Sequence, residues 1–304
     1  MRRFAVVLAM VMWSGGAYAA SPAIHTEDVT LFYQVYDAAG GHPTADQIQH
    51  DYIDKGSDGL RSFLKQRRTT AARIVQAIAD HPQVYADARK CLAVLPRAKE
   101  RVSTALSKLG SLYPEAKFPP VTVAIGRGKP VAIADETGVM VGLESLCAVS
   151  WMPADLEDRV TYVIAHEYTH VQQALASPAF YNIDKPTVLD AAIIEGAAEF
   201  MGILTSGGTS YAYFAKATAG REKQIETAFV PDEDKTDLSA WFFNGTLEKP
   251  GDMGYWVGRR IVQSYYEHAT DKRAAIRDII EIKDAHAFLT KSGWYPGIVL
   301  KSGQ

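Results

Sequence analysis

The stretch from Asp155 to Leu175 constrains the fold most, because it sets polar groups into an apolar helical pattern. Asp155 is a candidate N-cap, and acidic residues follow it as in the first turn of a helix. Apolar residues then recur at helical spacing, at Leu156, Val160, Val163, Ile164, Val171 and Leu175. The same stretch contains His-Glu-Tyr-Thr-His at positions 166–170. Two imidazoles and a carboxylate on a largely buried helix are costly to desolvate alone, so the pattern predicts a partner for them.

The spacing of His166 and His170 suits a shared metal ion. Positions i and i+4 of an α-helix are separated by about 40° of rotation and about 6 Å of rise, so both rings can reach one ion. Zinc held by three protein groups keeps a position for water, lowers the pKa of that water towards about 7 and polarises a substrate carbonyl. The motif therefore predicts Zn²⁺ as the cofactor and metal-dependent hydrolysis as the chemistry, with Glu167 as the general base.

The third metal ligand must come from elsewhere in the chain. The metzincin arrangement would place Gly at position 173 and His at position 176; the chain has Gln173 and Ala176, so that class is excluded. A second predicted helix, Val188–Leu204, carries Glu195 and Glu199 one turn apart on one face. Like charges so placed repel unless something positive lies beside them. The two acids therefore form either a metal-binding face or a solvated helix face.

The two motifs and their spacing resemble those of the gluzincins, the metalloproteases that include thermolysin and a large class of zinc aminopeptidases. The chain has His-Glu-x-x-His, then residues 171–194, then Glu-Gly-x-Ala-Glu and an aromatic residue. More narrowly, it resembles a bacterial family of predicted zinc-dependent proteases. The resemblance covers residues 121–290. It implies a mainly helical α+β protein with a zincin-like (gluzincin) fold, a small sheet and a peptide or protein substrate.

The resemblance also implies roles for individual residues. His166, His170 and Glu195 would hold the zinc ion. Glu199 matches the acidic residue that hydrogen-bonds a histidine ligand and fixes its tautomer, although thermolysin-like members have Asp there. Tyr255, in Gly-Tyr-Trp-Val-Gly, matches the Tyr-x-x-Gly element that stabilises the oxyanion in gluzincin aminopeptidases.

The assignment of Tyr255 has two alternatives. Tyr255 could instead be a core aromatic residue that opens a predicted helix at residues 257–267. His268 or His286 could donate in its place, since thermolysin uses a histidine as well as a tyrosine. No motif surrounds either histidine.

Residues 120–126 and 138–144 read as two short β-branched strands separated by a polar loop. We call the predicted helix that carries His166 and His170 the metal helix. In a gluzincin-like fold, the edge strand just before this helix binds an extended peptide by strand addition. Glu144 is expected to be a surface carboxylate at a strand end, the alternative being recognition of a substrate amine.

The N-terminus predicts export. Arg2 and Arg3 precede an apolar run from Phe4 to Trp13 and small residues that end at Ala20, as in a secretory signal peptide. No other run approaches the roughly 20 apolar residues of a membrane span. We therefore expect a periplasmic or secreted protein without a membrane anchor. Removal of the two arginines takes the formal net charge from -3 to -5, which provides no basic surface for nucleic acid.

The chain contains two cysteines, Cys91 and Cys147. In an oxidising compartment the default expectation is a disulfide between them, which closes a loop of about 57 residues and stabilises the fold by roughly 4 kcal/mol. Two buried thiols are the alternative. A role as zinc ligands is disfavoured, because their separation matches no compact cysteine motif.

The chain divides into a signal peptide (1–20), an N-terminal helical region (21–118) and a zincin-like catalytic region (119–304). Helical periodicity predicts three or four helices before residue 112, with interruptions near Pro82 and Pro96. It predicts three more at 257–267, 271–280 and 284–290. Two functions other than peptide hydrolysis remain open: a non-catalytic zinc protein whose groove binds a partner, and a zinc hydrolase of a non-protein amide such as peptidoglycan.

Overall fold

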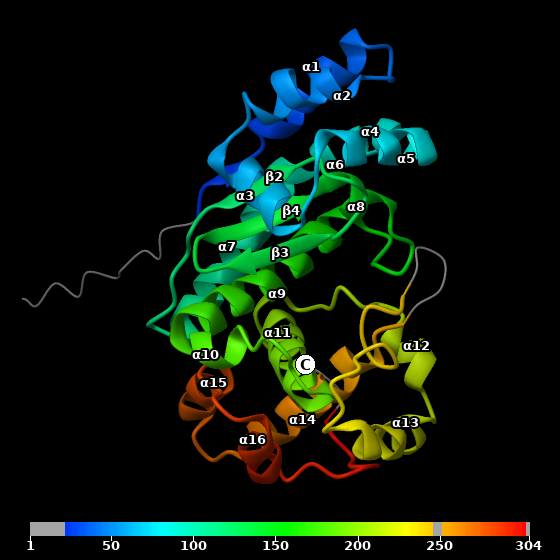
Figure 1. The fold of residues 1–304 in the computed structure, drawn as a ribbon. Helices are drawn as coiled ribbons and strands as arrows, with labels where there is room; N and C mark the ends of the chain where they lie inside the picture. Colours follow the sequence, from blue (N-terminus) through cyan, green and yellow to red (C-terminus); the bar gives the residue numbers. More distant parts are fainter. Residues whose placement is uncertain (1–21, 246–250, 302–304) are drawn as a thin grey trace, which may run out of the picture.

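The computed structural model describes residues 22–245 and 251–301 (Figure 1). The expected signal peptide at residues 1–20 lies outside the described residues. Within the two described ranges, no helix is both long and apolar enough to cross a membrane. The sheet and the N-terminal helices occupy the upper half of Figure 1, and the later helices the lower half.

A four-stranded sheet lies at the centre, in the order β1-β2-β4-β3. Strands β1 (Ile24–His25), β2 (Val121–Ala124) and β4 (Gly138–Gly142) are parallel, and β3 (Ala132–Asp135) runs antiparallel to β4. Every residue of β2 and β4 is buried, as expected for central strands covered on both faces. The fold is therefore α+β, with a small sheet among many helices.

Two expectations about the sheet are wrong. Four strands are present in the described chain where two were predicted, and β3 occupies the segment that was read as a loop. The strand just before the metal helix, β4, is not an edge strand, because β3 pairs with its outer side. The edge that faces the later helices is therefore β3.

Glu144 is also not a surface residue. Strand β4 ends at Gly142, and Glu144 lies in the short helix α8 (Leu143–Ala148) with 1 % of its surface exposed. One carboxylate oxygen accepts hydrogen bonds from the backbone N–H groups of Gly126 (3.0 Å) and Gly128 (2.9 Å). Glu144 thus holds the loop after β2 and has no surface from which to meet a substrate amine.

The N-terminal region contains more and shorter helices than predicted. The helices are α1 (Glu27–Ala38), α2 (Ala45–Gln47), η1 (Ile48–Ile53), α3 (Asp58–Gln66), α4 (Ala71–Asp80), α5 (Pro82–Asp87), α6 (Arg89–Leu92) and α7 (Leu95–Leu112). Pro82 and Pro96, predicted as interruptions, stand in the first turns of α5 and α7. Proline is tolerated there because its missing N–H has no helical partner to lose.

Cys91 of α6 and Cys147 of α8 form a disulfide, as the sequence predicted. The bond joins residues with Cα atoms 6.1 Å apart. It ties the N-terminal helices to the segment between β4 and the metal helix. The buried hydrophobic core is continuous from α1 through the sheet to the last helices, and the boundary near residue 118 stays a prediction.

The metal helix is α9 (Leu156–Ala176), which begins as predicted, with the Asp155 carboxylate accepting from the N–H of Asp158. The glutamate helix is α11 (Val188–Ser206), which a capping box at Thr187 begins and Gly207 ends in the left-handed conformation. Helix α14 (Met253–His268) packs along α11. The remaining helices are α10 (Pro178–Tyr181), α12 (Phe214–Thr218), α13 (Glu222–Phe229), η2 (Val230–Asp232), α15 (Lys272–Ile280) and α16 (Ala285–Ser292).

Helices α11 and α14 approach so closely that two glycines are required. A Cβ at Gly196 would overlap the backbone of Gly258 and Arg259, and a Cβ at Gly258 would overlap the carbonyl of Ala192. Gly196 is the glycine of the Glu-Gly-x-Ala-Glu motif, so α14 packs directly against the motif. This contact fixes the rotation of α11 and hence the direction of its carboxylates.

Candidate metal centre

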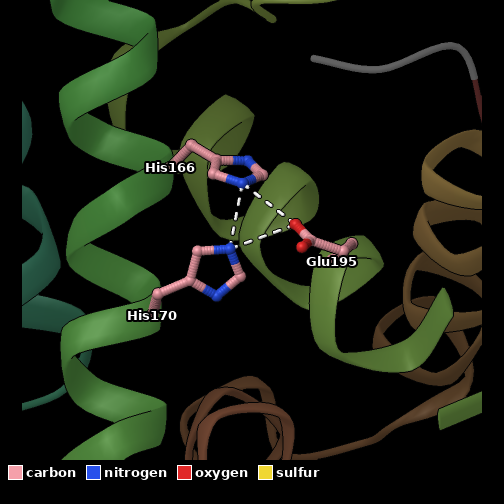
Figure 2. Close-up of side chains that lie close together, drawn as sticks. All are labelled: His166, His170 and Glu195. Carbon is pink, nitrogen blue, oxygen red and sulfur yellow. Dashed lines mark hydrogen bonds and ion pairs between the residues drawn. The ribbon is translucent and has the colours of Figure 1, made fainter. Parts of the chain in front are cut away.

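Three side chains from two helices converge on one point (Figure 2). His166 and His170 project from the same face of α9, and Glu195 reaches them from α11. The two Nε2 atoms are 3.1 Å apart. The Oε2 atom of Glu195 lies 3.1 Å from Nε2 of His170 and 3.3 Å from Nε2 of His166.

This triangle of donor atoms fits a zinc ion. Ligand atoms held about 2.0–2.1 Å from a tetrahedral zinc ion stand about 3.4 Å apart, close to the three separations found here. Two imidazole nitrogens and a carboxylate oxygen are also the donor set that zinc accepts. In the described part of the chain, these three residues are the group whose donor atoms are arranged to hold a metal ion.

The outward-facing nitrogens of both imidazoles have partners. Nδ1 of His166 lies 3.3 Å from the carboxylate of Glu199, at ion-pair distance although not aligned for a hydrogen bond. The Thr209 hydroxyl donates to the other oxygen of Glu199 at 2.7 Å. Nδ1 of His170 lies 2.7 Å from the amide oxygen of Gln173, whose NH₂ group donates to the Ile194 carbonyl. Such contacts orient a histidine so that Nε2 faces the metal.

The charges around the two rings reinforce one another. Burial alone lowers the pKa of an imidazole, but the carboxylates of Glu195 and Glu199 outweigh burial and raise the pKa of His166 to about 10. Burial raises the pKa of the Glu195 carboxyl, but the two imidazoles outweigh that effect and hold its pKa well below the ordinary range. The site thus stabilises positive charge between the rings and the acid.

Glu167 lies beside the triangle on the wall of a cavity of 580 Å³. Burial raises the pKa of its carboxyl, which the two neighbouring imidazoles partly offset. The cavity is bounded by β3 on one side and by residues of α9 and α11, and the C-terminal end of α3 contributes Gln66 and Arg67. Strand β3 and Glu167 therefore line the same cavity.

Tyr255 also lines this cavity, near the start of α14. Its ring centroid is 6.3 Å from that of His166, and the ring of Tyr211 lies 4.8 Å away on another side. Burial raises the pKa of the Tyr255 hydroxyl well above 10, so this group keeps its proton. Tyr255 is thus a buried aromatic residue that lines the cavity and keeps its hydroxyl proton.

The alternative donors lie elsewhere. The Nδ1 atom of His268 is 3.2 Å from the Ser292 carbonyl, and Nε2 of His286 is 2.8 Å from Asp234. Neither histidine lines the cavity, so neither can replace Tyr255.

Sequence reasoning missed several residues of the cavity and its supports. Gln173 follows His170 by three positions on a helix, a spacing that could have been recognised as a contact. Thr209, Ser210 and Tyr211 follow Gly207-Gly208 directly after the glutamate helix, but only the folded chain brings them back to Glu199 and the cavity. Nothing in the sequence around Tyr181 indicated its position beside His170, with ring centroids 5.5 Å apart.

The fold and the site define a mainly helical α+β protein with a candidate His-His-Glu metal centre. Residues 118–284, more than half of the chain, match the family described as "Predicted Zn-dependent protease (DUF2268)". The chain belongs to this family. No curated protein matches it, and no solved structure does.

Proposed function

We propose that this protein is a zinc-dependent peptidase of gluzincin type that acts in the periplasm or outside the cell. The observation that carries the proposal is the triangle of His166, His170 and Glu195, with Glu167 beside it on the cavity wall. The family description supports zinc and proteolysis as the general chemistry. The disulfide between Cys91 and Cys147 agrees with an oxidising compartment.

His166, His170 and Glu195 would hold the ion, which when bound lowers the pKa of a water molecule and polarises the scissile carbonyl. Glu167 accepts the proton of the attacking water and passes it to the leaving amine. Glu199 and Gln173 keep the two imidazoles oriented with Nε2 towards the ion. Tyr255 donates its hydroxyl proton as a hydrogen bond to the developing oxyanion.

The edge of β3 supports an extended peptide substrate. Val131 and Ile133 face β4 in the ladder, since the N–H of Gly142 donates to the Val131 carbonyl and strand pairing alternates. The backbone polar groups of Ala132 and Ala134 therefore point outward, along the cavity. The Tyr181 hydroxyl donates a hydrogen bond to the Ala134 carbonyl at 3.1 Å. Both backbone groups of Ala132 and the N–H of Ala134 can pair with a peptide by strand addition.

Glu167→Gln tests the proposal. The variant should retain stoichiometric zinc, because Glu167 is not a ligand, and should cleave peptides roughly 10²-fold more slowly or worse, because proton transfer is lost. Cleavage of denatured casein and of a random peptide pool would be followed by mass spectrometry, with zinc measured by elemental analysis. Glu100→Gln, an exposed substitution on α7, is the matched control.

Two results would contradict the proposal. Equal turnover by wild type and Glu167→Gln would remove Glu167 as the base. Stoichiometric zinc with no cleavage of any peptide would favour a binding protein or, if peptidoglycan fragments were cleaved, a hydrolase of non-protein amides.

A further inference from the structure

The loop from Gly207 to Tyr211 is built into the wall of the metal centre. Gly207 adopts the left-handed conformation that ends α11, and the ring of Tyr162 fills the space where a Cβ of Gly208 would stand. Thr209 then donates to Glu199. Tyr211 stacks on Phe214 with ring centroids 4.8 Å apart and on Trp151 at 5.2 Å. The loop is therefore held on both sides of Ser210, before any ligand binds.

Ser210 is the residue of this loop that lacks a partner. Ser210 lines the same cavity as Glu167, yet only 5 % of the residue is exposed, and its hydroxyl oxygen is buried. Within residues 22–245 and 251–301, its hydroxyl makes no hydrogen bond. A buried hydroxyl left unpaired costs about 1–3 kcal/mol, and most buried polar groups avoid this state. A partner supplied by a ligand in the cavity would account for it.

We propose that Ser210 is a substrate-binding residue whose hydroxyl hydrogen-bonds the main chain of the bound peptide next to the scissile bond. This inference rests on the proposed peptidase function. A serine hydroxyl can donate one hydrogen bond and accept others, so it suits both the N–H and the carbonyl of a peptide. The neighbouring rings of Tyr211 and Tyr255 give the peptide an apolar surface beside this polar contact.

The structure offers a matched control for this proposal. Ser145 of α8 is also buried, with 2 % exposed, and its hydroxyl likewise has no hydrogen-bond partner in the described chain. Ser145 does not line the cavity. The two serines therefore share burial and an unpaired hydroxyl, and they differ in that Ser210 lines the cavity and Ser145 does not.

The experiment compares Ser210→Ala, Ser210→Thr and Ser145→Ala with wild type, using the peptide of a random pool that wild type cleaves fastest. Ser210→Ala should lower kcat/KM about threefold to tenfold, the worth of one neutral hydrogen bond. Zinc content should stay stoichiometric, and the melting temperature should be unchanged or higher, because an unpaired polar group has been removed. Ser210→Thr retains the hydroxyl and should recover most of the loss. Ser145→Ala should keep the kcat/KM of wild type.

Binding of the same peptide, measured by calorimetry, separates substrate contact from chemistry. In the Glu167→Gln background, Ser210→Ala should weaken the peptide Kd by a similar factor. Unchanged kcat/KM and Kd in a folded Ser210→Ala protein would overturn the role of Ser210 while leaving the peptidase function intact. A loss of melting temperature and zinc in both Ser210 variants would show a structural residue and overturn it too. Failure of wild type to cleave any peptide would reject the function and this inference together.

Discussion

The N-terminal region and the pair α11–α14 are made rigid in different ways. From α1 to α8, every helix except α7 (18 residues) has 12 residues or fewer, and a disulfide joins α6 to α8 across 56 positions of sequence. Helices α11 and α14 are long and have no covalent link, and glycines let their backbones touch at Gly196 and Gly258. Long helices bury enough surface to hold one another, whereas short ones joined by loops lose more entropy per contact. Glu195 lies on this packed pair, whereas His166 and His170 lie on α9, which packs against both α11 and α7.

Two faces of helix α11 have different contacts. One side meets α14 through glycine, with no space for a side chain, and another presents Glu195 and Glu199 to the histidines of α9. The close contact limits how α11 can rotate, and this in turn limits the positions that its carboxylates can take. The four predictions below would break or sharpen the comparison between the covalent and the packed region, in order of decreasing effect.

Cys91→Ala combined with Cys147→Ala should lower the free energy of unfolding by about 4 kcal/mol, because the unfolded chain regains the freedom of a long loop. Urea unfolding measures the loss. Zinc content of the folded variant should not change, since neither cysteine lines the metal cavity. Loss of zinc from a folded variant would mean that the disulfide, and not helix packing, positions the donors.

Gly196→Ala should destabilise the protein by about 3 kcal/mol or more, because its Cβ would overlap the backbone of α14. Gly202→Ala on the same helix is the control. A Cβ there would lie 3.4 Å from the backbone of His166, an ordinary contact, and alanine favours a helix over glycine by about 1 kcal/mol. Thermal unfolding should separate the two variants clearly. Equal melting temperatures would refute the idea that α14 fixes the orientation of α11.

Glu199→Gln should weaken zinc binding about 10-fold to 100-fold, because the imidazole of His166 loses a charged partner while the side chain keeps its size. Competition with a chelator of known affinity measures the change. Thr209→Val, which removes the hydrogen bond to Glu199 and leaves its charge, should have a smaller effect in the same direction. An unchanged zinc affinity in Glu199→Gln would assign Glu199 to packing alone.

Glu144 of α8 should make the stability of the protein depend weakly on pH. Burial raises the pKa of its carboxyl above the ordinary 4.5, so the folded protein holds this proton more tightly than the unfolded chain. The contribution of Glu144 to stability is therefore greatest below pH 4.5 and declines as the pH rises towards the raised pKa. Relative to wild type, Glu144→Gln should become more stable as the pH rises from 4.5 towards the raised pKa, by less than about 1.4 kcal/mol per pH unit. A constant difference in melting temperature over that range would contradict the raised pKa.

Local patterns predicted the helices that carry the site and could not predict the edge beside it. The start of α9 at Asp155 and the extent of α11 follow from a cap and from helical periodicity, which neighbouring residues encode. Strand β3 has no such local sequence pattern. Residues Ala132–Asp135 form a strand because they pair with β4. Glu144 was misread for a related reason, since its burial depends on a loop that folds back over it.

The position of each imidazole could be predicted, but the supports around it only in part. Glu199 stands one helical turn from Glu195, so its nearness to the histidines followed once the two helices were paired. The contact of Gln173 with His170 was within reach of the same spacing argument. Ser210 and Tyr211 were not, because their approach to the cavity depends on the turn at Gly207 and on packing against Trp151.

The hydroxyl of Tyr181 on the Ala134 carbonyl has a consequence for self-association. An open sheet edge that accepts a peptide also accepts a strand from another copy of the protein, which is the usual route to aggregation. Because the Ala134 carbonyl already accepts a hydrogen bond from Tyr181, only a short run of β3 backbone remains to pair with another strand. Contacts so brief favour rapid exchange, so pairing of this edge with a second copy of the protein should be short-lived.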